Sequence, residues 1–161
     1  MAEQSFIHCE NSNDHLTLHD CVAEKAYLKD GALIFEFKDG FWISPQHPEN
    51  SHGKMLRTDD AKVEFVLAKG TFDAYAKVST RSVFKKEVCE YWDIEQLISK
   101  INSEKCPIQF CDQYYNKHTN NYAILCYLLG KGKYSWSECW LFISQKETKY
   151  YWNNLCTDKT W

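Results

Sequence analysis

The chain has 161 residues, a net charge of −3 at pH 7 and an aromatic content of 16%. This length fits a single domain spanning residues 1–161, and so many aromatic residues exclude a disordered protein. A nucleic-acid-binding protein usually carries a basic patch, but the nearest candidate, Lys85-Lys86, is followed at once by Glu87. We therefore expect no nucleic-acid partner.

The N-terminal residues 1–14 are polar, and we expect them to be only partly ordered. They lack the basic and apolar segments of a signal peptide, and the longest apolar run, residues 122–129, is too short to cross a membrane. The sequence therefore predicts a cytoplasmic protein without a membrane partner. In that compartment the eight cysteines stay reduced, and Cys126 and Cys139 lie in apolar segments typical of buried thiols.

The first Asp-Gly pair, Asp30-Gly31, lies between two segments of alternating apolar and polar residues, which is the pattern of a tight β-hairpin. With these two residues as the turn, Leu28 faces Leu33 on the core side and Lys25 faces Glu36 on the outer side. The remaining facing pairs are Ala26 with Phe35 and Tyr27 with Ile34. Because a slip of one residue would turn every side chain to the other face, this register is strongly specified.

The second Asp-Gly pair, Asp39-Gly40, predicts that the chain continues as an antiparallel meander. In this register Phe37 lies opposite Trp42. The meander should end before the proline-containing loop of residues 45–53, because proline cannot donate a ladder hydrogen bond.

Residues 61–68 and 72–78 alternate in the same way. They predict a second hairpin around Lys69-Gly70. The register that this turn imposes also places Lys62 opposite Lys77, and like charges in directly opposite positions are unfavourable.

The segment of residues 93–102 breaks the strand pattern and predicts an amphipathic helix. Asp93 is the expected N-cap, and Gln96 follows at the capping-box spacing. The apolar residues that recur at helical spacing are Ile94, Leu97, Ile98 and Ile101. Further strands are expected over residues 82–91, 108–115, 122–129, 134–145 and 149–155. The elements together predict an α+β, mainly β fold with roughly eight to ten antiparallel strands in one sheet or two, and the helix at about 93–102 covering part of a face.

One face of the strand expected near the N-terminus would carry His15, Thr17, His19 and Cys21. Imidazole and thiolate are ligands of zinc, but on a strand this spacing is not that of a standard zinc site, and no CxxC or HExxH motif occurs. The alternative is that the neighbouring leucines point inward, the histidines are solvated and Asp20 caps the turn. We therefore expect no metal and no other cofactor.

No signature of a hydrolase, a kinase, a phosphate-binding loop or a dinucleotide-binding motif occurs in the sequence. A nucleophilic cysteine needs a depressed pKa, which a helix N-terminus or a neighbouring cation provides. Cys89 is the nearest candidate, because it lies about one turn before the expected helix. We expect no catalytic residue and interpret the protein as non-enzymatic.

Six tryptophans and ten tyrosines are more than one small core absorbs if all of the rings point inward. We expect some rings to be exposed or to line a groove, whereas a sheet covered on both faces would bury them. The residues expected to contribute to binding are His19, Asp20, Trp42, Tyr151 and Trp152.

Residues 16–43 contain the run Leu18-His19-Asp20-Cys21-Val22, followed by the hairpin LKDGALIFEFKDGFWI. This segment resembles the opening of small bacterial β-rich proteins of unassigned function, some of which are similar to immunity proteins of toxin systems. Cys21 departs from that pattern, in which a smaller polar residue is expected. The resemblance implies a protein partner and carries over no catalytic residue.

Composition and resemblance together predict a cytoplasmic binding protein, with an immunity-type protein partner as the first interpretation. The alternative is a small-molecule or carbohydrate-binding module that uses Trp and Tyr rings as stacking platforms. A flat aromatic patch would favour a protein partner, and a concave pocket lined by tryptophan would favour a small ligand.

Overall fold

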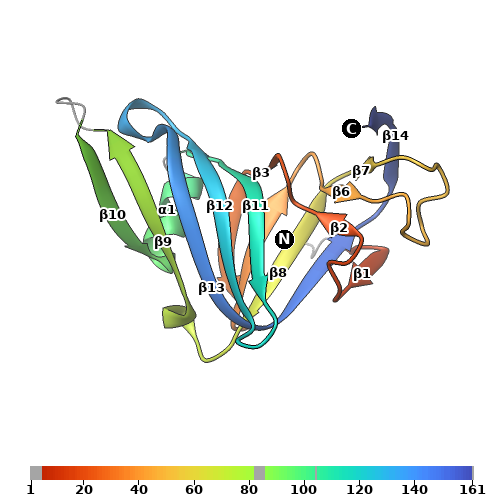
Figure 1. Ribbon diagram of the computed structural model, residues 1–161, viewed down its shortest axis with the longest axis horizontal. Coiled ribbons are helices and arrows are strands. Elements are labelled where there is room, and N and C mark those ends of the chain that lie inside the picture. Colours follow the sequence, from red (N-terminus) through yellow and green to blue (C-terminus); the bar gives the residue numbers. More distant parts are fainter. Residues whose placement is uncertain (1–4, 82–85, 104, 161) are drawn as a thin grey trace.

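Strand β13 (Ser135–Trp152) has 18 residues and is shared by both halves of the larger of two antiparallel sheets in the computed structural model (Figure 1). The structure describes residues 5–81, 86–103 and 105–160. The ten strands of the large sheet are β1 (His8–Glu10), β3 (Cys21–Ala23), β4 (Lys25–Lys29), β5 (Ala32–Phe37), β8 (Ala61–Leu67), β9 (Ala74–Arg81), β10 (Glu87–Asp93), β11 (Ile108–Asn116), β12 (Asn121–Leu129) and β13. The small sheet contains β2 (Leu16–Thr17), β6 (Trp42–Ile43), β7 (Leu56–Thr58) and β14 (Leu155–Thr160). The other described elements are the helix α1 (Ile94–Ser103) and two 3-10 turns, η1 (Thr71–Asp73) and η2 (Gly132–Tyr134).

The predicted α+β, mainly β class is confirmed. Nine described strands have five or more residues, and the other five have two or three. Such short strands contain too little alternation to be recognised in a sequence. Of the strand expected over residues 82–91, residues 82–85 lie outside the described residues, Lys86 is not in a strand, and residues 87–91 belong to β10. In the described part of the chain, no helix has the length and apolar character needed to span a bilayer.

The large sheet curls so strongly that strands from its two ends pack against each other. Along the sheet, β5 and β11 are separated by β12, β13 and β8. Four strand spacings would keep them about 19 Å apart in a flat sheet. Instead, the rings of Phe35 on β5 and Phe110 on β11 meet with their centroids 5.2 Å apart. Phe37 also packs on Phe110, so the core lies inside the curl and the other face of each strand points outward.

The hairpin of β4 and β5 has the predicted register. Leu28 pairs with Leu33, and Lys25 pairs with Glu36. The Lys25 ammonium lies 3.4 Å from the Glu36 carboxylate, as expected for an opposite-charge pair across the ladder. Asp30-Gly31 forms the turn with φ angles of 51° and 78°.

The predicted continuation of the meander at Asp39-Gly40 is wrong. Phe37 pairs with Ala61 on β8, and Trp42 pairs with β2 and β7 in the small sheet. The chain still turns here, because Gly40 N donates to the Phe37 carbonyl over 3.0 Å. The turn leads out of the large sheet instead of back along it.

Gly40 lies where the chain passes from β5 in the large sheet to β6 in the small one. Its φ angle is 70°, and a Cβ atom here would lie 2.2 Å from Thr58 Oγ1 and 2.3 Å from the Asp59 carbonyl oxygen. The next amide, Phe41 N, donates to Thr58 Oγ1 over 3.0 Å. This close backbone approach, which only glycine permits, replaces the predicted strand pairing.

The predicted hairpin around Lys69-Gly70 is also wrong. β8 and β9 do not pair with each other; both pair with β13, one after the other. The connection between them includes η1, whose Phe72 is fully exposed. The unfavourable pairing of Lys62 with Lys77 is thereby avoided, and Lys62 faces Glu36 instead.

The boundaries of the C-terminal strands differ from the prediction. The strands expected over residues 134–145 and 149–155 are joined in β13, with a register shift between Gln145 and Glu147. β12, expected to be covered on both faces, is central but has one buried and one half-buried face. In the N-terminal segment, β1 pairs with the end of β13.

Helix α1 lies behind β9 and β10 in Figure 1 and touches both strands on the core side. Its predicted capping box is confirmed. Gln96 N donates to Asp93 Oδ1 over 2.8 Å, and Asp93 N donates to Gln96 Oε1 over 3.0 Å. The apolar stripe is also confirmed, with Ile94, Leu97 and Ile101 buried and Ile98 packed against the core.

All eight cysteines are free thiols. Cys126 and Cys139 face each other across β12 and β13, and both are buried, as predicted. Burial raises the pKa of the Cys139 thiol to about 12 and that of Cys126 well above its ordinary value. Cys9 and Cys89 are exposed.

We predict that Gly40→Ala lowers the free energy of unfolding by at least about 3 kcal/mol, because the methyl group meets Thr58 and Asp59 in addition to the cost of a positive φ angle. Gly31→Ala is the matched control. It has the same Asp-Gly setting and a φ angle of 78°, but nothing lies within 4 Å of its Cβ position. The control should therefore lose only about 1–2 kcal/mol. Urea unfolding followed by circular dichroism measures both, and equal losses would contradict the role of the close approach.

Candidate functional site

In the first half of β13 the outer face carries aromatic side chains, whereas the inner face carries smaller and aliphatic ones. Cys139, Leu141 and Ile143 are buried in the core. Trp140 and Phe142, which alternate with them, are half-buried. Because successive side chains on a strand point to opposite faces, these two rings lie on the solvent side of the sheet. Figure 1 shows α1 on the other side of β9, β12 and β13.

Four rings on this outer face form a continuous row, which we call the aromatic row: Tyr75 on β9, Phe142 and Trp140 on β13, and Tyr114 on β11. Tyr75 and Phe142 face each other across the strands, with ring centroids 4.9 Å apart and an interplanar angle of 21°. Trp140 lies 6.5 Å from Phe142, and Tyr114 lies 6.0 Å from Trp140. Nearly parallel rings at 4.9 Å overlap in an offset stack, so neighbouring rings hold one another in place.

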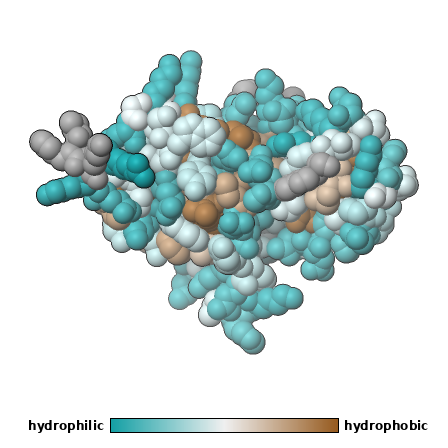
Figure 2. Space-filling model, turned by 45° about the horizontal axis from the view of Figure 1, so that its top comes forward, coloured by the Kyte–Doolittle hydropathy of each residue, from teal (hydrophilic) through white to brown (hydrophobic). Residues whose placement is uncertain are grey.

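The aromatic row is wide enough to be an interaction surface. It crosses four strands, and three strand spacings give a width of about 14 Å. Tyr75 is 44% exposed and Tyr114 is 56% exposed. Figure 2, turned by 45° from Figure 1, shows apolar and pale side chains gathered near the centre of a face that is otherwise largely hydrophilic. A contiguous patch of this kind marks a binding surface more often than scattered single rings do.

Charges lie singly among these rings. Lys77 on β9 faces Trp140 on one side and the exposed Tyr91 of β10 on the other. Trp140 Nε1 donates to Glu138 Oε1 over 2.9 Å. The surface is therefore aromatic with separated charges of both signs, and it is not a strongly acidic or basic patch.

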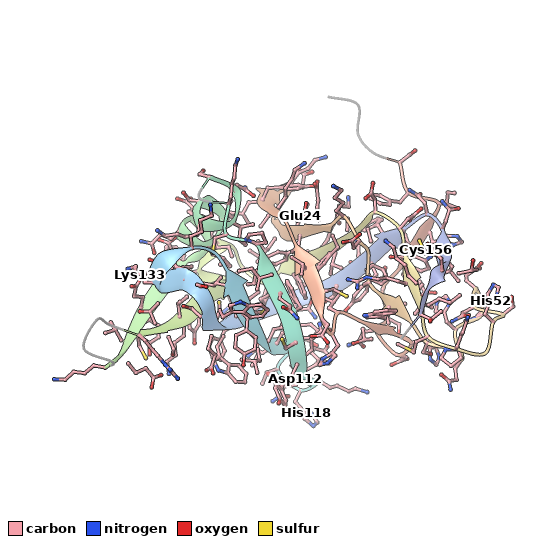
Figure 3. All side chains as sticks on the ribbon, turned by 90° about the horizontal axis from the view of Figure 1, so that it is seen from above. Glu24, His52, Asp112, His118, Lys133 and Cys156 are labelled. Carbon is pink, nitrogen blue, oxygen red and sulfur yellow. The ribbon has the colours of Figure 1, made fainter. Side chains whose placement is uncertain are left out.

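A hollow of about 970 Å³ opens farther along the same strands, and we call it the Trp136 hollow. Its lining comes from β9, β10, β12, β13 and η2 and includes Arg81, Glu87, Tyr127, Ser135, Trp136 and Glu138. Lys133, which also lines it, is labelled at one end of the molecule in Figure 3, with His52 and Cys156 at the opposite end. The hollow is thus concave and polar, with two aromatic rings in its wall.

Trp136 occupies a strained backbone position. The register of β12 against β13 shifts between Leu128 and Leu129, and Trp136 is the extra, unpaired residue of this bulge. Its φ angle is 55°. In this left-handed region an L-residue other than glycine costs about 1–2 kcal/mol. Its side chain is 67% exposed, and the centroid of the Tyr127 ring lies 6.5 Å from that of its indole. Strain of this kind is concentrated at functional sites.

Glu90 on β10 holds Lys133, one of the residues that line the hollow. Its Oε1 accepts a hydrogen bond of 2.7 Å from Lys133 Nζ, and its Oε2 accepts bonds of 3.1 Å from Trp92 Nε1 and Tyr134 Oη. The hydrogen bond from Lys133, joined by those from Trp92 and Tyr134, holds the pKa of Glu90 below its usual value. Within the described sheets β10 pairs only with β9. The hydrogen bonds of Glu90 to Lys133 and Tyr134 therefore connect β10 to η2 as well.

Two of the predicted site residues, Trp42 and Trp152, are buried, with 9% and 1% of their surface exposed. The ring of Trp152 stacks on His8 at 5.0 Å and packs against Phe41 and His47 at 5.8 Å. The polar N-terminal segment and the loop after β6 therefore cover this ring. Neither tryptophan presents a ring face to solvent.

Tyr151 is half-buried beside other side chains. Its ring lies 5.8 Å from Phe6, and the Lys62 ammonium lies 4.4 Å from its centroid. Its hydroxyl donates to Glu64 Oε2 over 3.0 Å. Tyr150, the preceding residue, is buried on the opposite face, so this strand presents aromatic rings on both sides.

His19 and Asp20 attach the turn between β2 and β3 to β11. His19 Nδ1 donates to the Cys111 carbonyl over 3.0 Å, and Gln109 Nε2 donates to Asp20 Oδ1 over 2.9 Å. Asp112, labelled in Figure 3, lies 3.9 Å from His19 Nδ1. Because Asp20 has a φ angle of 56°, the expected single strand is interrupted here. Leu16 and Leu18, on either side of Thr17, are buried, as expected if these leucines point inward and the segment is not a zinc site.

The binding roles of the five predicted site residues stay predictions, and the exposed rings lie elsewhere. Tyr75, Tyr114, Trp136 and Trp140 are absent from the predicted set. One signal for them exists in the sequence, because Trp136, Trp140 and Phe142 alternate with the smaller residues that fill the core. A strand that is aromatic on one face and aliphatic on the other indicates an exposed aromatic face.

In the described residues, no three His, Cys, Asp or Glu side chains form a group that could hold a metal ion. No protein-family model, no curated protein and no solved structure matches this chain. The aromatic row and the Trp136 hollow are therefore the features from which a function can be argued.

We predict that Trp136→Gly is as stable as the wild type, within about 0.5 kcal/mol, or more stable by about 1 kcal/mol, because glycine relieves the left-handed strain. Trp140→Gly is the matched control on the same strand. Trp140 packs against Phe142 and Tyr114, and its loss should cost about 2 kcal/mol or more. Urea unfolding measures both variants. A loss for Trp136→Gly as large as that for Trp140→Gly would contradict the assignment of strain.

We predict that Glu90→Gln lowers the free energy of unfolding by about 1 kcal/mol near pH 7, because the three donors lose a charged acceptor. A carboxyl whose pKa is lowered by folding stabilises the protein above its unfolded pKa and loses this effect as the pH falls. The difference between wild type and variant should therefore shrink below about pH 4.5. Urea unfolding at several pH values tests this. Glu24→Gln, at an exposed site labelled in Figure 3, is the control and should show little difference at any pH.

Proposed function

We propose that this protein is a non-enzymatic binding protein and that the aromatic row is the centre of its interface with a protein partner. The observation that supports this is the continuous set of solvent-facing rings on the regular strands β9, β13 and β11. Tyrosine and tryptophan are the residues most enriched at the energetically important centres of protein interfaces.

The orientation of the rings favours a protein partner over a small ligand at this place. Tyr75 and Phe142 overlap face to face, so one face of each ring is already occupied. Phe142 has Tyr75 on one side and Trp140 on the other, while Tyr75 and Tyr114 remain partly exposed and carry hydroxyl groups. A protein surface can pack on such a row and hydrogen-bond to its hydroxyls, whereas a stacked small ligand needs an open ring face.

The rigidity of the row also supports binding. The rings lie on central strands of a curled sheet and restrict one another by stacking, so few rotamers are lost when a partner docks. A row about 14 Å wide would cover only part of the roughly 800 Å² that each partner buries in a standard interface. Lys77, Glu138 and the exposed Tyr91 would form the surrounding polar rim.

The resemblance of residues 16–43 to the opening of immunity-like proteins supports a toxin domain as the partner. This segment contributes the β4–β5 hairpin, which packs into the core rather than onto the aromatic row. The resemblance therefore supports the class of partner, and the exposed rings support the surface that it contacts.

We predict that a photo-crosslinking amino acid at position 140 gives a specific adduct with one protein in cells of the organism of origin, and that Trp140→Ala weakens binding of that purified protein. The affinity should fall at least about tenfold, or ~1.4 kcal/mol, because the ring lies at the centre of the row. Isothermal titration calorimetry measures the dissociation constant. Circular dichroism confirms that the variant is folded.

Phe72 supplies the matched control, because its ring is fully exposed but lies in the connection between β8 and β9, outside the row. Phe72→Ala should change the dissociation constant by less than about twofold. Equal crosslinking from positions 72 and 140, or an unchanged affinity of folded Trp140→Ala, would contradict the proposed interface.

A further inference from the structure

We infer that the Trp136 hollow is a second binding site, separate from the aromatic row, and that it takes a neutral saccharide. The hollow has a volume of about 970 Å³, whereas a smaller and more open one of about 680 Å³ lies beside Tyr114 and Phe142 of the row. A volume of this order is typical of pockets that hold small organic ligands. The inference rests on the ring geometry and on the charges in the wall, and it holds whether or not the row binds a protein.

The ring geometry provides an open stacking platform. Trp136 is 67% exposed, and its centroid lies 6.5 Å from Tyr127 with an interplanar angle of 56°. At this distance and tilt the two rings do not overlap as Tyr75 and Phe142 do. The indole therefore keeps a free face toward the hollow. The C–H face of a pyranose ring packs on such a surface.

The backbone explains why this ring is open. The bulge leaves Trp136 without a partner on β12, and the φ angle of 55° directs the chain through a conformation that glycine would adopt more readily. A large apolar ring in this position gains little from the core. A ligand that stacks on it supplies the missing contact.

The polar groups of the wall match hydroxyl groups. Arg81 and Glu87 are directly opposite each other on β9 and β10, and within the described residues neither forms an ion pair. Arg81 can only donate hydrogen bonds, and Glu87 can only accept them. The hydroxyls of Thr80 and Ser137, in contrast, already bond to backbone carbonyls. A ligand hydroxyl, which both donates and accepts, can bond to either free group.

The balance of charge selects a neutral ligand. Arg81 and Lys133 are matched by Glu87 and Glu138 in the same wall. Lys133 is also occupied by its 2.7 Å bond to Glu90. A nucleotide or a sulfated sugar would bring its anionic groups beside two carboxylates, and a purely apolar ligand would leave the charged groups without partners.

The test is nuclear magnetic resonance of the uniformly ¹⁵N-labelled protein titrated with cellohexaose, chitohexaose and maltohexaose. The indole N–H signal of Trp136 is assigned by its absence from Trp136→Phe. We expect at least one of these neutral probes to shift that signal with a dissociation constant below about 1 mM. Trp136→Ala should raise this constant at least about tenfold, and Trp136→Phe, which keeps a ring, should raise it less. Arg81→Gln should raise it about fivefold.

Phe72→Ala is the control and should bind the same probe as the wild type does, because its exposed ring lies outside the hollow. Thermal melting confirms that each variant is folded. No shift of the Trp136 signal with any of the three probes at about 10 mM would overturn the inference. So would binding that survives in folded Trp136→Ala, or a shift produced only by an anionic probe such as ATP or a heparin hexasaccharide.

Discussion

The curl of the large sheet around β13 is the constraint on which the rest of the structure depends. One 18-residue strand forms hydrogen-bonded ladders with β12 and β9 in its first half and with β8 and β1 in its second. Because these ladders twist in one direction, the strands beyond them approach each other. The contact between Phe35 and Phe110, across four strand spacings, is the result. It gives every strand of the sheet a clear inside and outside.

This division explains why aliphatic and aromatic residues separate in the first half of β13. The inside of the curl is narrow and is filled by residues such as Cys139, Leu141 and Ile143. In the described part of the chain no element lies over the outside of β9, β13 and β12. Trp140 and Phe142 are supported there by neighbouring rings, and Trp140 also by its bond to Glu138. The same strand thus builds the core and presents the binding surface, and a partner meets side chains whose backbone is already fixed by the core.

Local features were predictable from the sequence, and long-range pairings were not. The β4–β5 register follows from two facing alternations and one turn, and the start of α1 follows from Asp93 and Gln96. Gly40 shows why long-range pairing was not predictable. An Asp-Gly pair suits a turn that leaves the sheet as well as a hairpin turn. The contact that decides between them is made with Thr58, a residue that is not a neighbour in the sequence. The like-charge pair of Lys62 and Lys77 was the observation in the sequence that argued against the second hairpin. The burial of Trp152 had no such signal, because the segments that cover its ring are polar.

The free thiols differ in solvent exposure, so their reactivity toward an alkylating reagent depends on which part of the sheet has opened. Cys126 and Cys139 sit at the centre of the curl, and burial keeps them protonated and out of reach of electrophiles. Cys9 and Cys89 lie at the surface, close to the free ends of the sheet. An alkylating reagent therefore meets the outer pair at once and the inner pair only when β12 and β13 separate, so the order in which cysteines are modified reports where the sheet comes apart first.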